Sequence, residues 1–225
     1  MTEELVDLYT GKTIRALAVL LLFGVVAAQS PDLGAQLASE GNGQGAAACS
    51  SCHGANGEGM PGTAFPRLAA LPAGYLASQL QAFRDGTRND PVMSANAKAL
   101  TDEEVAAAAE YYASLDAPAA AGTAAEEQEE LGRFIAERGA WHRYVPSCQS
   151  CHGPGGMGVG DDFPPLAGQS AAYMVKQFAD WQANSRTNDP LGMMHAVAAR
   201  LTDEEIEAVA AWYSAVSPAV PEQED

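Results

Sequence analysis

A five-residue motif with two thiols and an imidazole occurs twice in the chain, as Cys49-Ser50-Ser51-Cys52-His53 and as Cys148-Gln149-Ser150-Cys151-His152. Two thiols at this spacing can add to the two vinyl groups on one edge of a porphyrin, and Cys-x-x-Cys-His is the attachment pattern of c-type haem. The histidine would then lie under the ring, where its imidazole can bind the iron. We therefore predict two covalently bound haem c groups, one for each motif.

A zinc site or a redox dithiol would explain the cysteines of the two motifs but not the histidines. Two Cys-x-x-Cys pairs could form a four-cysteine zinc site, and a single pair could be a redox dithiol. Neither of these sites needs the histidine that follows the second cysteine in both copies, at His53 and His152. The motifs contain all four cysteines of the chain, so no thiol remains for a disulfide.

Each iron then needs a second axial ligand from elsewhere in its half. A methionine sulfur raises the reduction potential relative to a second imidazole and closes the iron to substrate. Met93 lies in an expected loop eight residues before Thr101, and Met194 lies eight residues before Thr202. Counted from the proline that precedes the loop, Met193 comes nearer to the expected place. We expect the downstream count to hold, which selects Met194.

The predicted iron ligands are thus His53 with Met93 and His152 with Met194. Met60 and Met157 follow their histidines so closely that the chain would have little slack to reach the far face of a ring. We expect both to pack in loops or at the haem edge. His142 and His195, the histidines outside the motifs, are expected at the surface or beside the propionates, although His195 could replace its neighbour as a ligand.

The two halves match well beyond the motifs, which indicates an internal duplication. The matching segments are Phe65–Ala69 with Phe163–Ala167, Asn89–Pro91 with Asn188–Pro190, and Thr101–Glu104 with Thr202–Glu205. In each half a proline follows the motif histidine by about a dozen residues. Its backbone carbonyl could accept a hydrogen bond from the imidazole, so we expect Pro66 and Pro164 to orient the ligands.

The elements that must position these residues are predicted to be helices. Tyr75–Asp85 and Ala171–Asn184 lack glycine and proline and carry apolar residues at near-helical spacing. Both Thr-x-x-Glu segments are capping boxes that begin a final helix. No segment shows sustained strand alternation, so we predict an all-α fold. It would hold two tandem domains at 31–116 and 126–218, joined by a linker at 117–125 and followed by an acidic tail at 219–225.

The composition and the N-terminus restrict the partners and the compartment. A formal charge of -17 makes nucleic acid and anionic lipid poor partners. Residues 16–28 are continuously apolar and follow Lys12 and Arg15. This length fits a secretory signal and is short for a membrane span, so residues 1–30 are a signal peptide or an N-terminal anchor, with a possible tether through residues 14–28. Both possibilities place the rest of the chain in the periplasm.

Together these features resemble the dihaem cytochrome c4 family, which has two class I c-type domains in tandem. The resemblance runs from about Leu33 to Val216 and rests on the two haem motifs with their following glycines, the Pro-x-Leu-Ala segments, and Met93 and Met194 before the final helices. It implies that three to five helices wrap each haem. It also implies His/Met ligation and electron transfer between membrane donors and terminal oxidases.

The leading functional hypothesis is therefore a non-catalytic, one-electron carrier between respiratory-chain components. Its partners would be a terminal oxidase, a quinol-oxidising complex or a dehydrogenase. The main alternative is a cytochrome subunit of a membrane oxidase or of a periplasmic dehydrogenase such as flavocytochrome c. An enzyme, either a dihaem peroxidase or a thiosulfate-oxidising cytochrome, is less favoured, because it needs an iron with a vacant or exchangeable position.

Overall fold

The computed structural model describes residues 31–120, 122, 124–189 and 191–218. Within this part the chain is helical, and its β-structure is limited to three isolated bridges. The predicted all-α class is thus confirmed. The segments expected to be a signal or anchor and an acidic tail lie outside the described residues. Among the helices that are described, none combines the length and apolarity needed to cross a membrane.

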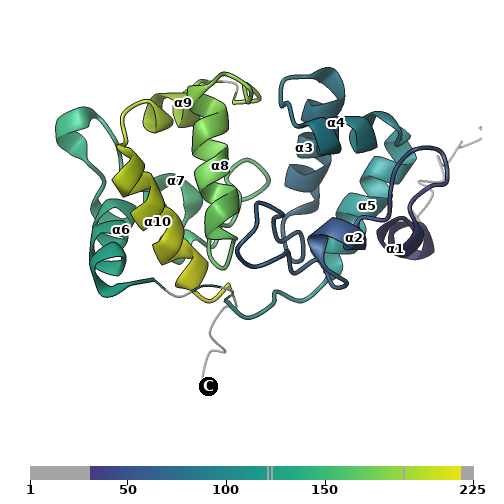
Figure 1. The fold of residues 1–225 in the computed structure, drawn as a ribbon, viewed down its shortest axis with the longest axis horizontal. Coiled ribbons are helices and arrows are strands. Elements are labelled where there is room, and N and C mark those ends of the chain that lie inside the picture. Colours follow the sequence, from purple (N-terminus) through teal and green to yellow (C-terminus); the bar gives the residue numbers. More distant parts are fainter. Residues whose placement is uncertain (1–30, 121, 123, 190, 219–225) are drawn as a thin grey trace, which may run out of the picture.

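The helices form two similar groups that lie side by side, the first running from purple to teal and the second from teal-green to yellow (Figure 1). The first group consists of α1 (Pro31–Glu40), α2 (Ser50–His53), α3 (Ala73–Asp85), α4 (Pro91–Lys98) and α5 (Asp102–Ser114). The second consists of α6 (Glu126–Arg138), the 3-10 turn η1 (Trp141–Arg143), α7 (Gln149–His152), the 3-10 turn η2 (Pro154–Gly156), α8 (Ala171–Gln182), α9 (Met193–Ala198) and α10 (Asp203–Ala215).

The first and last helices of each group cross with their backbones in close contact. A Cβ atom placed on Gly34 of α1 would lie 2.4 Å from the Ala107 carbonyl oxygen of α5, and one on Gly132 of α6 would lie 2.2 Å from the Ala208 carbonyl oxygen of α10. Glycine is therefore required at both crossings by space rather than by backbone conformation. The same crossing in both groups confirms that the repeat is structural.

Both predicted capping boxes are present. The Glu104 carboxylate accepts from the Thr101 amide at 2.7 Å, and the Glu104 amide donates to the Thr101 hydroxyl at 3.2 Å. Thr202 and Glu205 make the same pair of bonds at 2.8 and 3.3 Å. These caps satisfy amides that the first helical turn leaves free, so they fix where α5 and α10 begin.

The helices of each group pack around their own apolar core. Ile135, Val145, Val209 and Tyr213 are almost fully buried in the second group, and Leu37 and Tyr112 in the first. The middle helices agree with the sequence expectations, since α3 starts two residues before Tyr75 and α8 ends two residues before Asn184. The cores leave room for a large cavity between the helices.

Candidate haem sites

One continuous cavity of about 1370 Å³ runs through both groups, and both thiol–imidazole motifs line it. It exceeds the ~300–1,000 Å³ that is usual for a pocket with one small ligand. The lining is mostly apolar, with Leu76 and Phe83 in the first half and Met174 and Phe178 in the second. Its size and lining suit large flat apolar groups in both halves.

Each motif forms a short helix that presents its histidine to the cavity. His53 ends α2 and donates its backbone amide to the Cys49 carbonyl at 2.9 Å, and His152 ends α7 with the equivalent bond to Cys148 at 2.8 Å. The turn brings both thiols and the imidazole of a motif to the same cavity wall. Burial raises the pKa of both Cys49 and Cys148, the latter to about 11, so these sulfurs are thiols before attachment.

The predicted proline carbonyls orient both imidazoles. His53 Nδ1 lies 2.9 Å from the Pro66 carbonyl oxygen, and His152 Nδ1 lies 2.8 Å from that of Pro164. A carbonyl can only accept, so Nδ1 carries the proton and Nε2 keeps its lone pair for a metal. Burial lowers the pKa of both imidazoles, and Arg186 adds to this at His152. Both histidines are therefore neutral, as metal ligation requires.

The methionines chosen from the sequence lie in short helices rather than in the expected loops. Met93 is in the first turn of α4 and Met194 in the first turn of α9. In each case a preceding aspartate accepts from the methionine amide, Asp90 at 3.0 Å and Asp189 at 2.6 Å. The helices arise because a carboxylate at this place satisfies amides that have no partner within the first turn.

The methionines considered as iron ligands differ in their burial and in whether they line the cavity. Both Met193 and Met194 line the cavity, but Met193 is 42% exposed while Met194 packs against the core of the second half. Met194 also shares with Met93 the hydrogen bond to an aspartate. Met60 and Met157 are not among the described residues that line the cavity.

The two remaining histidines have other surroundings, although His195 directly follows Met194 in α9. His142 is exposed in η1. The ring of His195 is held at its Nδ1 by the Trp181 carbonyl oxygen at 3.0 Å. Neither belongs to the described lining of the cavity.

Sequence reasoning missed a buried polar cluster where the two halves meet. Arg88 and Arg186 face each other in an antiparallel bridge, and both are buried. The Gln177 side-chain oxygen accepts from Arg88 at 2.6 Å and from Arg186 at 2.9 Å. The Gln79 side-chain oxygen accepts from the same two guanidinium groups at 3.0 and 3.1 Å. An arginine just before each Asn-Asp-Pro segment of this acidic chain was the available signal.

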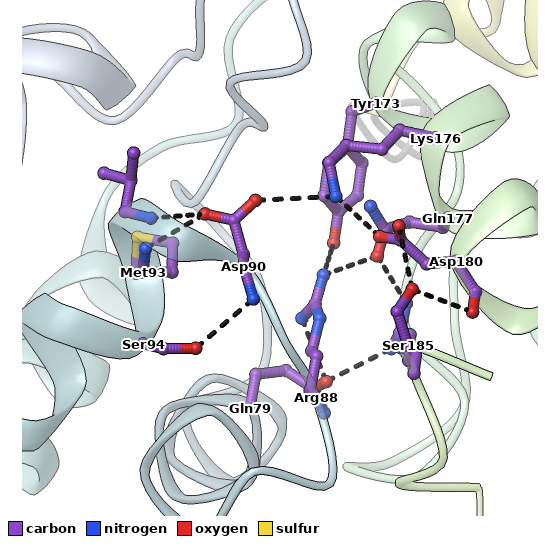
Figure 2. A network of polar contacts seen from close by, with 12 residues as sticks. Gln79, Arg88, Asp90, Met93, Ser94, Tyr173, Lys176, Gln177, Asp180 and Ser185 are labelled. Carbon is purple, nitrogen blue, oxygen red and sulfur yellow. Dashed lines mark hydrogen bonds and ion pairs between the residues drawn. The ribbon is translucent and has the colours of Figure 1, made fainter. Parts of the chain in front are cut away.

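A second set of contacts joins the halves near Met93 (Figure 2). The Lys176 ammonium group lies 2.6 Å from Asp180 of its own helix and 3.5 Å from Asp90, the residue that caps α4. Burial alone would raise the pKa of Asp90. The amides of Met93 and Val92, together with Lys176, outweigh burial and hold this pKa below its ordinary value. The carboxylate that caps α4 is therefore charged at neutral pH.

Several buried donors in the cavity wall have the chemistry to receive haem propionates. Arg88 and Arg186 form no ion pair within the part of the chain that is described. Burial, and then Arg88, lowers the pKa of Arg186, yet a guanidinium remains charged at neutral pH. The indole nitrogen of Trp181 is buried there without a partner in the described structure. Buried charges and donors need partners, so the residues present fit an acidic group in this cavity.

Comparisons with known proteins agree with this fit. The family described as "Cytochrome c" matches residues 38–116, and "Cytochrome C oxidase, cbb3-type, subunit III" matches residues 136–212. A cytochrome c4 of Pseudomonas aeruginosa is 34% identical over 74% of this chain and 83% of its own length. The crystal structure of reduced cytochrome c4 from Pseudomonas stutzeri matches with a TM-score of 0.72 and 30% identity, over 84% of this chain and all of that chain. The chain belongs to the dihaem cytochrome c4 family.

Two further relatives of this cytochrome c4 homologue are linked by name to thiosulfate oxidation. A thiosulfate dehydrogenase electron acceptor of Thiomonas intermedia is 51% identical over 76% of this chain and 79% of its own length. The structure of thiosulfate dehydrogenase (TsdBA) from Marichromatium purpuratum matches with a TM-score of 0.78 and 41% identity. That match covers 82% of this chain and 40% of the other, so the cytochrome spans about two fifths of that protein.

This cytochrome therefore carries two covalent haem c groups in two cytochrome c domains. Bound haem supplies one-electron exchange between ferrous and ferric iron, while the protein supplies ligands, an apolar wrap and fixed charges. The protein is an electron carrier rather than an enzyme, like the two relatives that are named as electron acceptors. In bacteria c-type haem is attached outside the cytoplasmic membrane, which places this cytochrome in the periplasm.

Proposed function

We propose that this cytochrome accepts electrons from a thiosulfate-oxidising dehydrogenase in the periplasm and passes them, one at a time, to a respiratory partner. The proposal is carried by the 51% identity to a protein named as a thiosulfate dehydrogenase electron acceptor. A second protein of that name, from Stutzerimonas stutzeri, is 45% identical over 90% of this chain and 94% of its own length. The match therefore includes both haem domains of this cytochrome.

The proposed ligands are those that suit a carrier. His53 and Met93 bind one iron, and His152 and Met194 bind the other. The proline carbonyls that orient both imidazoles support the histidines. The shared aspartate contacts of the two methionines support the choice of sulfur ligands. An iron with both axial positions filled has no place for a substrate, which separates this function from that of a peroxidase.

The negative charge of the protein predicts the charge of the surface to which it docks on its electron donor. With a formal charge of -17, this cytochrome is expected to approach a basic face of its electron donor, and steered association of this kind weakens as salt is added. The Debye length falls from about 30 Å at 0.01 M salt to about 8 Å at 0.15 M. We expect the rate of reduction by thiosulfate dehydrogenase with thiosulfate to fall on the order of tenfold across this range.

Stopped-flow absorbance of the haems measures this rate. Reduction by an uncharged hydroquinone is the control, since it should change little with salt. Failure of the dehydrogenase to reduce the cytochrome at any salt concentration would overturn the assigned donor. The carrier function would remain, and a quinol-oxidising complex would be the next donor to test, because cytochrome c4 proteins are also relatives.

The onward partner and the form of the N-terminus complete the proposal. We propose a terminal oxidase as the acceptor, in line with the electron-transfer role that the family resemblance implies. The apolar stretch at residues 16–28 is either removed as a signal or kept as a tether. The mass of the purified chain distinguishes these forms. A start at Gln29 or Ser30 means cleavage, and a start at Met1 or Thr2 means a tethered protein.

A further inference from the structure

A buried glutamine of the second domain is hydrogen-bonded to the backbone of the first. Gln169 lies just before α8 and is 4% exposed. Its side-chain oxygen accepts from the Arg67 amide at 2.8 Å, and its side-chain nitrogen donates to the Arg67 carbonyl oxygen at 3.0 Å. The amide group of one side chain thus pairs with both polar groups of one backbone residue, across the boundary between the domains.

The Arg67 amide belongs to the same peptide group as the Pro66 carbonyl. That carbonyl accepts from His53 Nδ1 at 2.9 Å. The peptide between Pro66 and Arg67 therefore accepts from the imidazole at one end and donates to Gln169 at the other. The three groups form an unbroken chain of hydrogen bonds from the second domain to the proposed iron ligand of the first.

Such a chain strengthens each of its members. When a peptide N–H donates, its carbonyl becomes more negative and a better acceptor, and this polarisation is larger in a buried, low-dielectric site. A stronger acceptor at Nδ1 makes the imidazole a more electron-rich ligand at Nε2. An electron-rich ligand favours ferric over ferrous iron. The group that ends the chain can therefore change the reduction potential without touching the haem.

The second domain cannot make the same arrangement. The peptide that orients His152 joins Pro164 to Pro165, and a proline nitrogen carries no hydrogen to donate. The position that matches Gln169 in the first domain is Leu71, which has no polar side-chain atom. The chain of hydrogen bonds therefore exists for one haem only.

Further hydrogen bonds hold the two loop segments that meet at this boundary in place. The Ser170 hydroxyl donates to the Thr63 carbonyl oxygen at 2.6 Å, and an Arg67 guanidinium nitrogen donates to the Ala167 carbonyl oxygen at 3.0 Å. Arg67 itself is 1% exposed. The glutamine is thus fixed relative to the peptide by bonds on either side of it.

We propose that Gln169 is a positioning residue of the second domain that tunes the first haem through the Pro66–Arg67 peptide and His53. This inference rests on the proposed ligation of iron by His53. If Gln169 acts in this way, the reduction potential of the first haem depends on contact with the second domain. The reduction potential of the second haem has no equivalent dependence on the first domain.

The direct test is Gln169→Leu, which installs the residue of the matching position. Loss of the acceptor should shift the ferric–ferrous equilibrium of the first haem about threefold to tenfold toward ferrous, or about 28 to 59 mV for a one-electron couple. The second haem should keep its potential. A two-step redox titration measures both values, and the paramagnetically shifted proton resonances of each axial histidine assign the steps. The His53 ring signals should move and those of His152 should not.

Ser170→Ala is the matched control, because it removes another hydrogen bond across the same boundary, together with the cap that this hydroxyl gives α8, and leaves the peptide untouched. It should leave both potentials unchanged. Equal shifts of both haems in Gln169→Leu, or no shift with unchanged His53 signals, would overturn the inference.

A second pair of variants keeps the test decisive if Gln169→Leu does not fold. Arg67→Met removes the guanidinium but keeps the peptide N–H, whereas Arg67→Pro removes both, as at Pro165. The proline variant should show the higher first-haem potential of the two, and equal potentials would count against the inference. A His53→Ala protein that kept its original axial ligand signals would instead overturn the ligation itself, which is a separate result.

Discussion

At the scale of single residues, the two halves use the same contacts to prepare an iron site. A neutral imidazole is held by a proline carbonyl, and a methionine is held through its amide by an aspartate. The first contact was predictable, because in each half a proline follows the motif histidine by 12 or 13 residues in the sequence. The helical setting of the methionines was not, since α9 has only six residues and too little periodicity to be recognised.

Substitution of the proposed sulfur ligands tests the site at this scale. Met93→Ala or Met194→Ala should lower the potential of one haem and open its iron to small ligands, because the sulfur that favours ferrous iron is lost. Covalent attachment should be intact, since the thiols are untouched. Visible spectra with added cyanide and a redox titration measure the change.

Met193→Ala is the control for the second half, and it should leave the ligand field unaltered. Unchanged spectra in Met194→Ala, together with altered spectra in Met193→Ala, would move the assignment to the neighbouring residue.

At the scale of elements, the capping boxes and the glycine crossings fix the helices that frame each site. The caps were predictable because they depend on residues three apart in the sequence. In the second domain the box has an additional partner, since an Arg143 guanidinium nitrogen donates to the Glu205 carboxylate. Burial alone would raise the pKa of Glu205, but the hydrogen bond and charge of Arg143 together with the hydrogen bonds to Thr202 outweigh burial, and the pKa lies below its ordinary value.

Because of this lowered pKa, the stability of the second domain should depend on pH. A carboxylate with a lower pKa in the folded state stabilises the protein above the pKa of the unfolded chain. That contribution disappears as the pH falls through the lower folded value. We expect Glu205→Gln to cost about 1 kcal/mol at pH 7 and little at pH 3. Guanidinium unfolding at both pH values measures the difference.

Glu204→Gln is the matched control, because Glu204 is exposed in the same helical turn. It should change stability little at either pH. An equal cost of Glu205→Gln at pH 7 and pH 3 would show that the box contributes through packing and not through its charge.

At the scale of the whole molecule, the domains are joined by polar contacts buried between them. Backbone bonds run in both directions, from the Asn89 amide to the Ser185 carbonyl at 2.8 Å and from the Thr187 amide to the Thr87 carbonyl at 2.6 Å. Gln79 lies at the centre, since its oxygen accepts from Arg88, Arg186 and, at 2.8 Å, Asn188. Loss of this one oxygen would remove an acceptor from three donor side chains at once.

Gln79→Leu should therefore destabilise the protein by about 1–3 kcal/mol. The effect should be concentrated at the domain boundary, where amide hydrogen exchange of Asn89 and Thr187 should become faster. Denaturant unfolding and hydrogen exchange give the two measurements.

Gln81→Leu is the control on the same helix, because Gln81 is exposed. It should lower stability by much less and leave boundary exchange unchanged. Similar effects of both variants would contradict the role assigned to the buried amide.

The features that could be predicted from the sequence are those whose residues all lie within one of the two repeats. The cysteine motifs, the caps and the orienting prolines are all read from neighbouring residues. The contacts that it missed join residues about a hundred positions apart, such as Gln169 with Arg67. A duplicated sequence shows that two domains exist, but their mutual orientation depends on shape and on buried donors that no local pattern reveals.

The two helix crossings at glycine also affect when each half can fold during synthesis. Because Gly34 meets α5 and Gly132 meets α10, the first helix of each half packs against the last one to be synthesised. Loops of this length close late, so each half acquires its tertiary structure only when its final helix is available. A chain that stops before Asp203 should therefore lose the order of the entire second half, while the first half retains its own closing helix.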